Sequence, residues 1–206
     1  MSDVLLICAD ASPRIGGGHV LRSLAIAEAW LEGDPRRQAL LFGAIESPRL
    51  IRRAEQSEVL VKAVPASLTV TEELQQIEHW LAELQIRDAP FVVVDGYRFD
   101  EGYLREVRER AKALAVVEDY VRLPHYDCDI LLNANLYAPE LKYSTAPRTK
   151  VLLGTEYSLL RTEFRRWKHW PREIPETAHK LLLSCGAADG ENLTAVLLKH
   201  LEAEPL

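Results

Sequence analysis

The stretch of sequence that decides the fold class begins four residues from the N-terminus. Residues 4–27 read VLLICADASPRIGGGHVLRSLAIA. Val4–Ala9 is an apolar run of strand length, three consecutive glycines follow at 16–18, and residues 20–31 carry apolar side chains at helical spacing. A strand, a glycine-rich turn and a helix in this order are typical of the first unit of a parallel α/β sheet.

The rest of the chain repeats this alternation. Short apolar runs predict further strands, and stretches with helical periodicity or capping residues predict the helices between them. Strands are expected at residues 39–42, 59–64, 91–94, 114–117, 129–132, 150–153 and 180–184, and helices at 47–57, 71–85, 100–113 and 192–201, with a further helix starting near 161–167. The pattern predicts a Rossmann-like α/β domain whose parallel sheet is complete by about residue 155.

Two prolines in a charged stretch, Pro171 and Pro175, indicate a linker after this sheet. We therefore expect an N-terminal domain over residues 1–168, a linker over 169–178 and the start of a second Rossmann-like domain over 179–206. One strand and one helix are too little chain for an independent core, so this second domain is expected to be incomplete.

Composition argues against several classes of function. The chain has 206 residues and a formal net charge of −6, so we expect no nucleic-acid partner. No apolar run is long enough to span a bilayer, and we expect no membrane partner. Cys8, Cys128 and Cys185 are scattered and form no CxxC pair, which argues against a zinc site or a disulfide framework and predicts a cytoplasmic protein.

The turn after the first strand is also the strongest candidate for chemistry, because open parallel sheets bind ligands at the carboxyl ends of their strands. Gly16, Gly17 and Gly18 let the backbone approach a ligand closely, and the helix that follows offers free N–H groups to an anion. His19 opens that helix and is placed to take a proton near neutral pH. A tight connection beside a surface histidine is the alternative that these residues alone leave open.

Several motifs in the same order resemble the UDP-2,4-diacetamido-2,4,6-trideoxy-β-L-altropyranose hydrolase family of pseudaminic acid biosynthesis and the related spore-coat polysaccharide proteins. The resemblance covers essentially the whole chain. The motifs are the stretch 10–27, Val94-Asp95-Gly96-Tyr97, residues 127–129 with 132–135, the stretch 153–164 and the stretch 183–194.

This resemblance implies a two-domain fold of the glycosyltransferase-B type, with the sugar in the cleft and the uridine diphosphate held mainly by the C-terminal domain. It implies hydrolysis at the anomeric carbon with inversion, without a metal or other cofactor, and with His19 as general base. The resemblance implies substrate contacts from Tyr97 and Arg161. Further candidate substrate contacts are Asp10, Gly16, Gly17, Gly18, Arg22, Asp95 and Asn135, and the stretch 183–194 adds Gly186, Asp189 and Asn192 as implied nucleotide contacts.

Three positions depart from the pattern of that family. Cys8 stands where an arginine is usual, Ser23 where a cysteine is frequent, and Ala187 where a turn usually has its second glycine. Because the arginine at the first position would supply a charge to the substrate, its replacement by Cys8 leaves the exact sugar open.

Alternatives remain open for several residues and for the chain as a whole. Asp95 either faces the cleft or caps a turn, and Asn133 and Asn135 either bind sugar hydroxyls or form turns. Glu118 and Asp119 form either a carboxylate pair for acid/base chemistry or a structural cap with a solvated neighbour, and the second interpretation is favoured. Besides a UDP-sugar hydrolase, the chain is compatible with a glycosyltransferase or a non-catalytic, truncated sugar-binding domain. A second copy or a separate C-terminal half is the expected protein partner.

Overall fold

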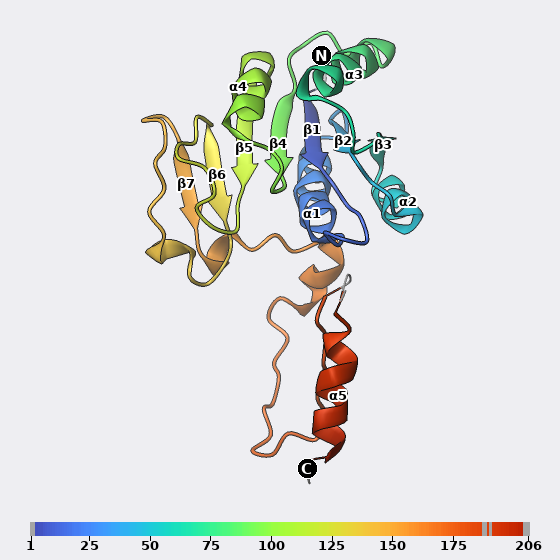
Figure 1. Ribbon diagram of the computed structural model, residues 1–206, viewed down its shortest axis with the longest axis vertical. Coiled ribbons are helices and arrows are strands. Elements are labelled where there is room, and N and C mark those ends of the chain that lie inside the picture. The colour runs from blue at the N-terminus through green and yellow to red at the C-terminus, as the bar shows by residue number, and fades with distance from the viewer. Residues whose placement is uncertain (1–2, 187–188, 190, 204–206) are drawn as a thin grey trace.

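The computed structural model describes residues 3–186, 189 and 191–203 (Figure 1). Its core is a seven-stranded sheet in the order β3-β2-β1-β4-β5-β6-β7, and every neighbouring pair is parallel. The strands are β1 (Val4–Ala9), β2 (Gln38–Gly43), β3 (Val59–Ala63), β4 (Phe91–Asp95), β5 (Ala113–Val117), β6 (Ile130–Asn133) and β7 (Lys150–Leu153). The predicted Rossmann-like α/β fold is confirmed.

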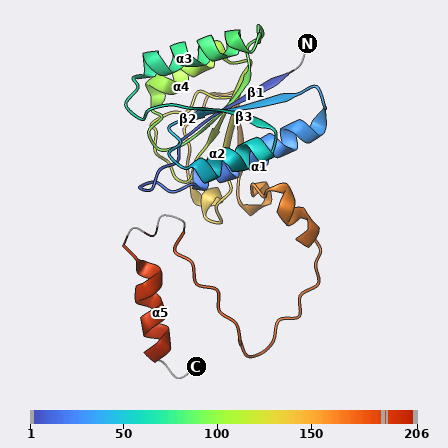
Figure 2. The ribbon, with the colours of Figure 1, turned by 90° about the vertical axis from the view of Figure 1, so that its right-hand side faces the viewer.

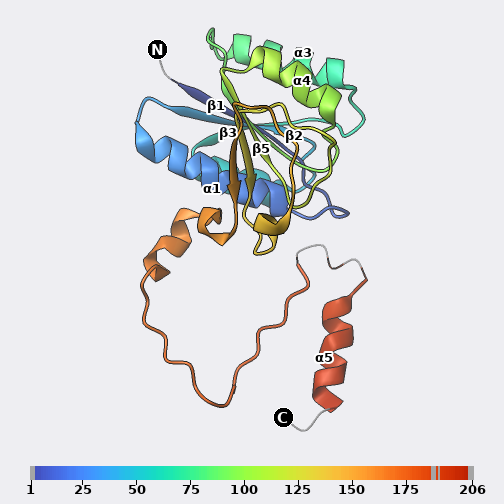
Figure 3. The ribbon, with the colours of Figure 1, turned by 90° about the vertical axis from the view of Figure 1, so that its left-hand side faces the viewer.

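Helices cover both faces of this sheet, as Figures 2 and 3 show from opposite sides. One face carries α1 and α2, and the other carries α3 and α4. Their bounds are α1 (Gly18–Gly33), α2 (Pro48–Gln56), α3 (Val70–Glu83) and α4 (Glu101–Arg110). The helices predicted at 47–57, 71–85 and 100–113 are present, although α4 ends earlier than expected because the chain must extend again to enter β5. The helix expected near 161–167 is a 3-10 helix, Thr162–Trp167.

The central strand β1 is buried along its whole length because helices lie over both of its faces. Leu5, Ile7 and Ala9 pack in the core beneath α1 and α2, whereas Leu6 and Cys8 pack in the core beneath α3 and α4. Burial on both faces explains why this strand is an unbroken apolar run in the sequence.

The carboxyl ends of β1 and β4 form the topological switch point of the sheet. From β1 the chain continues to β2 on one side, and the later strand β4 lies on the other side. Open parallel sheets bind ligands outside such a point. Asp95 at the end of β4 pairs in register with Ala9 and faces α1. Asp10 follows Cys8 by two residues and faces the opposite side of the sheet.

The strand expected at residues 180–184 is not formed, and that prediction is wrong. Leu181 and Leu182 are 69% and 92% exposed, and no described strand lies beside them. A lone strand leaves its backbone N–H and C=O groups without partners, so it does not form alone. The helix α5 (Leu193–Ala203) does form, and Figures 1–3 show it apart from the sheet and its helices. The expected domain boundaries stay predictions, and Ala187 lies outside the described residues.

Gly43, the last residue of β2, allows a test of the packing between β1 and β2. A Cβ atom at Gly43 would lie 2.0 Å from the backbone oxygen of Ala9, whereas one at Gly18 would meet nothing within 4 Å. Relief of the first clash requires two central strands to move apart, so we expect Gly43→Ala to lower the free energy of unfolding by roughly 2 kcal/mol or more.

The matched control is Gly18→Ala, which places alanine in the first turn of α1 and should be neutral or slightly stabilising. Urea unfolding followed by circular dichroism measures both variants. Equal stability of the two would contradict the close approach of β1 and β2.

Candidate active site

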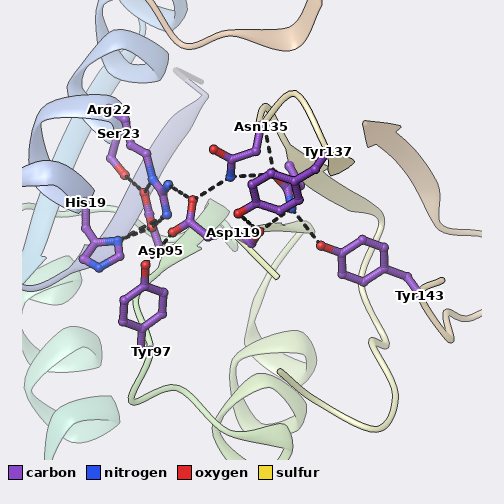
Figure 4. Close-up of polar contacts among 10 residues, drawn as sticks. His19, Arg22, Ser23, Asp95, Tyr97, Asp119, Asn135, Tyr137 and Tyr143 are labelled. Carbon is purple, nitrogen blue, oxygen red and sulfur yellow. Dashed lines mark hydrogen bonds and ion pairs between the residues drawn. The ribbon is translucent and has the colours of Figure 1, made fainter. Parts of the chain in front are cut away.

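The centre of the candidate site is the fully buried carboxylate of Asp95, and three side chains of α1 meet it (Figure 4). His19 Nδ1 lies 2.8 Å from Oδ1 of Asp95. Arg22 donates to both carboxylate oxygens at 2.6 Å, and the Ser23 hydroxyl donates to Oδ2 at 3.1 Å. Residues 19, 22 and 23 occupy one face of the helix, so a single carboxylate can collect all three donors. These donors satisfy a charge that would be costly to bury alone.

The contact with Asp95 decides which nitrogen of His19 carries the proton. A carboxylate oxygen only accepts, so Nδ1 donates to it and Nε2 keeps its lone pair. Arg22 Nη2 also lies 3.2 Å from Nδ1, but it is closer to Asp95 Oδ1, at 2.6 Å, and donates there. Among the described residues, none forms a hydrogen bond with Nε2. An imidazole oriented by a carboxylate and with a free lone pair is the arrangement of a general base.

A second carboxylate, Asp119, extends the cluster beyond the end of β5. Arg22 Nη1 and Asn135 Nδ2 donate to its Oδ1 at 2.6 Å and 3.1 Å, and the Tyr97 hydroxyl donates to its Oδ2 at 2.7 Å. Burial opposes ionisation of Asp119, but the hydrogen bonds from Arg22 and Tyr97 outweigh it and lower the pKa of Asp119 to about 2. Asp119 therefore stays charged at the pH values of most cells.

The expectation that one residue of the Glu118–Asp119 pair is solvated is wrong, because Glu118 is buried and the Asp119 side chain is only 19% exposed and is held by three donors. Glu118 does have a structural role. It is buried, accepts from Arg122 and Tyr126, and its pKa is raised by burial. Sequence reasoning missed the role of Asp119, although its position directly after a buried strand was a usable indication.

Tyr97 links the two halves of the cluster. Its ring meets the ring of His19 edge to face, with 4.7 Å between the centroids, while its hydroxyl binds Asp119. Burial and the hydrogen bond to Asp119 raise the pKa of Tyr97, so the hydroxyl keeps its proton and acts as a donor. The side chain is 47% exposed and lies at the open side of the cluster. The structure thus brings together His19, Arg22, Asp95, Tyr97 and Asn135 from the predicted set.

Asp10 does not join this cluster, because it faces the α3 and α4 side of the sheet. It accepts from the backbone N–H of Ala44 at 2.8 Å and from Arg98, whose guanidinium also pairs with buried Glu73 at 2.9 Å. Asp10 thus joins the ends of β1 and β2 to the loop after β4. Cys8 lies in the core on the same face, and burial raises its pKa to about 12. Arg98 was not among the predicted residues, although it follows directly after the motif that ends with Tyr97.

A groove of about 750 Å³ lies beside the glycine-rich turn. Gly16 and Gly17 form one wall, the first turns of α2 another, and Arg161 a third. Gly16 has a φ of 76°, a conformation that favours glycine. The described polar partner of Arg161 is Glu163, at 2.8 Å, so Arg161 lies with the glycines in the groove and not in the Asp95 cluster. Gly18 opens α1 directly before His19.

The implied nucleotide contacts lie at the start of α5. Asp189 accepts from the backbone N–H groups of Leu193 and Thr194 at 2.7 Å and 3.1 Å, so it caps this helix. A hydrogen bond with the Thr194 side chain is the main cause that lowers the pKa of Asp189, and the two backbone hydrogen bonds add to it. Gly186 and Asn192 have φ values of 84° and 53°. Nucleotide binding by Gly186, Asp189 and Asn192 stays a prediction.

Within residues 3–186, 189 and 191–203, no group of three or more His, Cys, Asp or Glu side chains is placed to hold a metal ion. Over the same part of the chain, no helix combines the length and apolar character needed to cross a bilayer.

Comparison with known proteins finds two distant relatives. The chain is 23% identical over 203 residues to an uncharacterized protein of Methanocaldococcus jannaschii. It is 26% identical over 208 residues to the UDP-2,4-diacetamido-2,4,6-trideoxy-β-L-altropyranose hydrolase of Campylobacter jejuni subsp. jejuni serotype O:2. Both alignments cover 96% of this chain, but only 39% of the first relative and 65% of the second. No family model and no solved structure matches the chain.

The low pKa of Asp119 predicts how stability changes in acid. A carboxyl whose pKa is lower in the folded state stabilises the fold above its unfolded pKa of about 4, and this contribution is lost as the pH falls towards about 2. We therefore expect the free energy of unfolding of Asp119→Asn to fall less steeply than that of the wild type as the pH decreases from about 4 to about 2. Urea unfolding at several pH values measures the slope. Asp127→Asn, at an exposed carboxylate paired with Arg148, is the control. If Asp119→Asn leaves this slope unchanged, the lowered pKa of Asp119 in the folded state is contradicted.

Proposed function

We propose that this chain carries the sugar-binding and catalytic half of a UDP-sugar hydrolase. The observation that carries the proposal is the His19–Asp95 pair, which lies at the carboxyl ends of β1 and β4 and leaves Nε2 of His19 without a described partner. Parallel sheets of this order bind ligands at that edge. The similarity to the Campylobacter jejuni hydrolase supports a substrate of the same class, a UDP-linked deoxy amino sugar.

In the proposed reaction, a water molecule attacks the anomeric carbon of the sugar. His19 Nε2 takes a proton from that water as its oxygen bonds to the carbon, and the bond from the carbon to the diphosphate oxygen breaks. UDP departs with the electron pair, and attack from the opposite side inverts the configuration. Asp95 stabilises the imidazolium that forms, since Nδ1 already donates to it.

The leaving group requires no metal in this proposal. UDP is a weak base, so the transition state needs stabilisation of the diphosphate charge more than it needs a proton donor. The groove beside Gly16 and Gly17 supports this role, because Arg49, Arg53 and Arg161 line it together with backbone of the turn. Glu46 and Glu163 also line the groove and limit its net positive charge.

The proposed architecture is of the glycosyltransferase-B type, with residues 179–206 as the beginning of a nucleotide-binding domain. The chain spans less than two thirds of the length of either relative. The proposed context is cytoplasmic synthesis of a nonulosonic-acid sugar of the pseudaminic acid type for a surface glycan.

The test is UDP release from UDP-2,4-diacetamido-2,4,6-trideoxy-β-L-altropyranose, with chelator present and no sugar acceptor added. We expect His19→Gln to lower kcat/KM by about 10²- to 10⁴-fold, the usual contribution of a general base. The matched control is His79→Gln, since His79 is exposed and pairs only with Glu83 on its own helix. The assay is run on this chain and on a version extended beyond residue 206 where the gene continues.

Three results would overturn the proposal. UDP release that His19→Gln leaves unchanged would remove His19 from the reaction. Release that requires an added acceptor would indicate a glycosyltransferase. No release from either length of chain would favour a sugar-binding domain without catalytic activity.

A further inference from the structure

We propose that Asp119 is a positioning residue that sets the proton affinity of His19 through Arg22. Neither residue of the proposed base pair touches Asp119, and the described contacts between them all pass through Arg22 or Tyr97. The effect of Asp119 on the pH dependence of kcat/KM rests on the proposed function. The charge coupling between Asp119 and His19 is a property of the folded chain alone.

The guanidinium of Arg22 is shared between two carboxylates. Its Nε and Nη2 donate to Asp95, and its Nη1 donates to Asp119, all at 2.6 Å. The exposed fractions of the three side chains are 25% for Arg22, 19% for Asp119 and 0% for Asp95. Charges in such a poorly solvated cluster interact more strongly than charges on an open surface.

The sum of charges gives the direction of the coupling. Asp119 contributes one of the two negative charges that share the guanidinium of Arg22, and loss of a negative charge near an imidazole makes protonation of that imidazole less favourable. Loss of the charge on Asp119 would leave Arg22 to neutralise Asp95 alone. Asp95 would then attract the Nδ1 proton of His19 less strongly, and protonation at Nε2 would become less favourable.

Tyr97 provides a second connection between Asp119 and His19. Its hydroxyl is held by Asp119, while its ring rests edge-on against the imidazole. Asp119 therefore fixes both the charged and the aromatic neighbour of His19. Among the described residues, the charged or titratable groups that face His19 and Asp119 are Arg22 from α1, and Asp95 and Tyr97 from the end of β4. Tyr120 lies beside them, with its ring 5.6 Å from that of Tyr97, and the Tyr137 hydroxyl donates to the backbone oxygen of Asp119 at 2.9 Å.

The experiment is an NMR titration of the His19 ring in the full chain. We expect Asp119→Asn to lower the pKa of His19 by about half a unit or more. Asp119→Glu, which restores the charge, should return the pKa towards that of the wild type. Asp127→Asn removes the same charge from an exposed carboxylate bound to Arg148 and should leave His19 unchanged. A His19 pKa that does not move in folded Asp119→Asn protein would overturn the proposal.

Arg22→Gln tests the coupling between Asp119 and His19 at the residue that connects them. It also provides the test if Asp119→Asn does not fold. Removal of the positive charge should raise the pKa of His19, and in that background Asp119→Asn should have a smaller effect than in the wild type. Equal effects of Asp119→Asn in both backgrounds, or a His19 pKa that Arg22→Gln lowers, would overturn transmission through Arg22.

Kinetics separate this inference from the proposed function. If the chain hydrolyses the UDP-sugar, the acidic limb of kcat/KM against pH should move to lower pH in Asp119→Asn by the same amount as the titration of His19. If the wild-type chain releases no UDP while the titration of His19 moves as expected, the hydrolase proposal fails and the positioning role of Asp119 stands.

Discussion

The carboxylate of Asp95 has no contact with solvent, and the arrangement around the carboxyl end of the sheet follows from the way its charge is compensated. Its register with Ala9 turns it towards α1, into a region that is otherwise apolar. An unpaired carboxylate there would cost several kcal/mol. Arg22, Ser23 and His19 must therefore all face β4, which fixes the rotation of α1 about its axis.

The same constraint connects stability with chemistry. Arg22 cannot leave Asp95 without exposing a buried charge, so it stays in place to bind Asp119 as well. Through Tyr97 and Asn135, Asp119 then joins the loops that follow β4 and β6. The result is a pre-arranged polar cluster across the ends of neighbouring strands, and such a cluster needs little rearrangement when charge develops in a reaction.

The fold was largely predictable from sequence because central parallel strands are buried on both faces and therefore appear as unbroken apolar runs. The strand expected at residues 180–184 has the same local pattern but no partner strand, and pattern alone does not contain that information. Within the site, the contact between His19 and Asp95 was not predicted, because the sequence left Asp95 open between a cleft residue and a cap. Asp10 is separated from them because it continues the alternation of Cys8, which places it on the opposite face of β1.

The contacts of Asp119 could not be predicted from the sequence. Its role depends on contacts with Arg22 and Tyr97, which are 97 and 22 residues away along the chain. Glu118 and Asp119 are adjacent acidic residues whose side chains point in different directions. Glu118 points into the core and binds Arg122, whereas Asp119 points towards α1 and binds Arg22. Only the path of the chain after β5 distinguishes them.

The central claim is that Asp95 holds the proton of His19 on Nδ1 and leaves Nε2 as the basic atom. Long-range ¹H–¹⁵N correlation spectra of the neutral imidazole test this claim most directly, because the two ring nitrogens have distinct shifts when only one is protonated. The account predicts that His19 is the Nδ1–H tautomer in the wild type and that Asp95→Asn weakens this preference. A neutral His19 protonated on Nε2 in the wild type would contradict it.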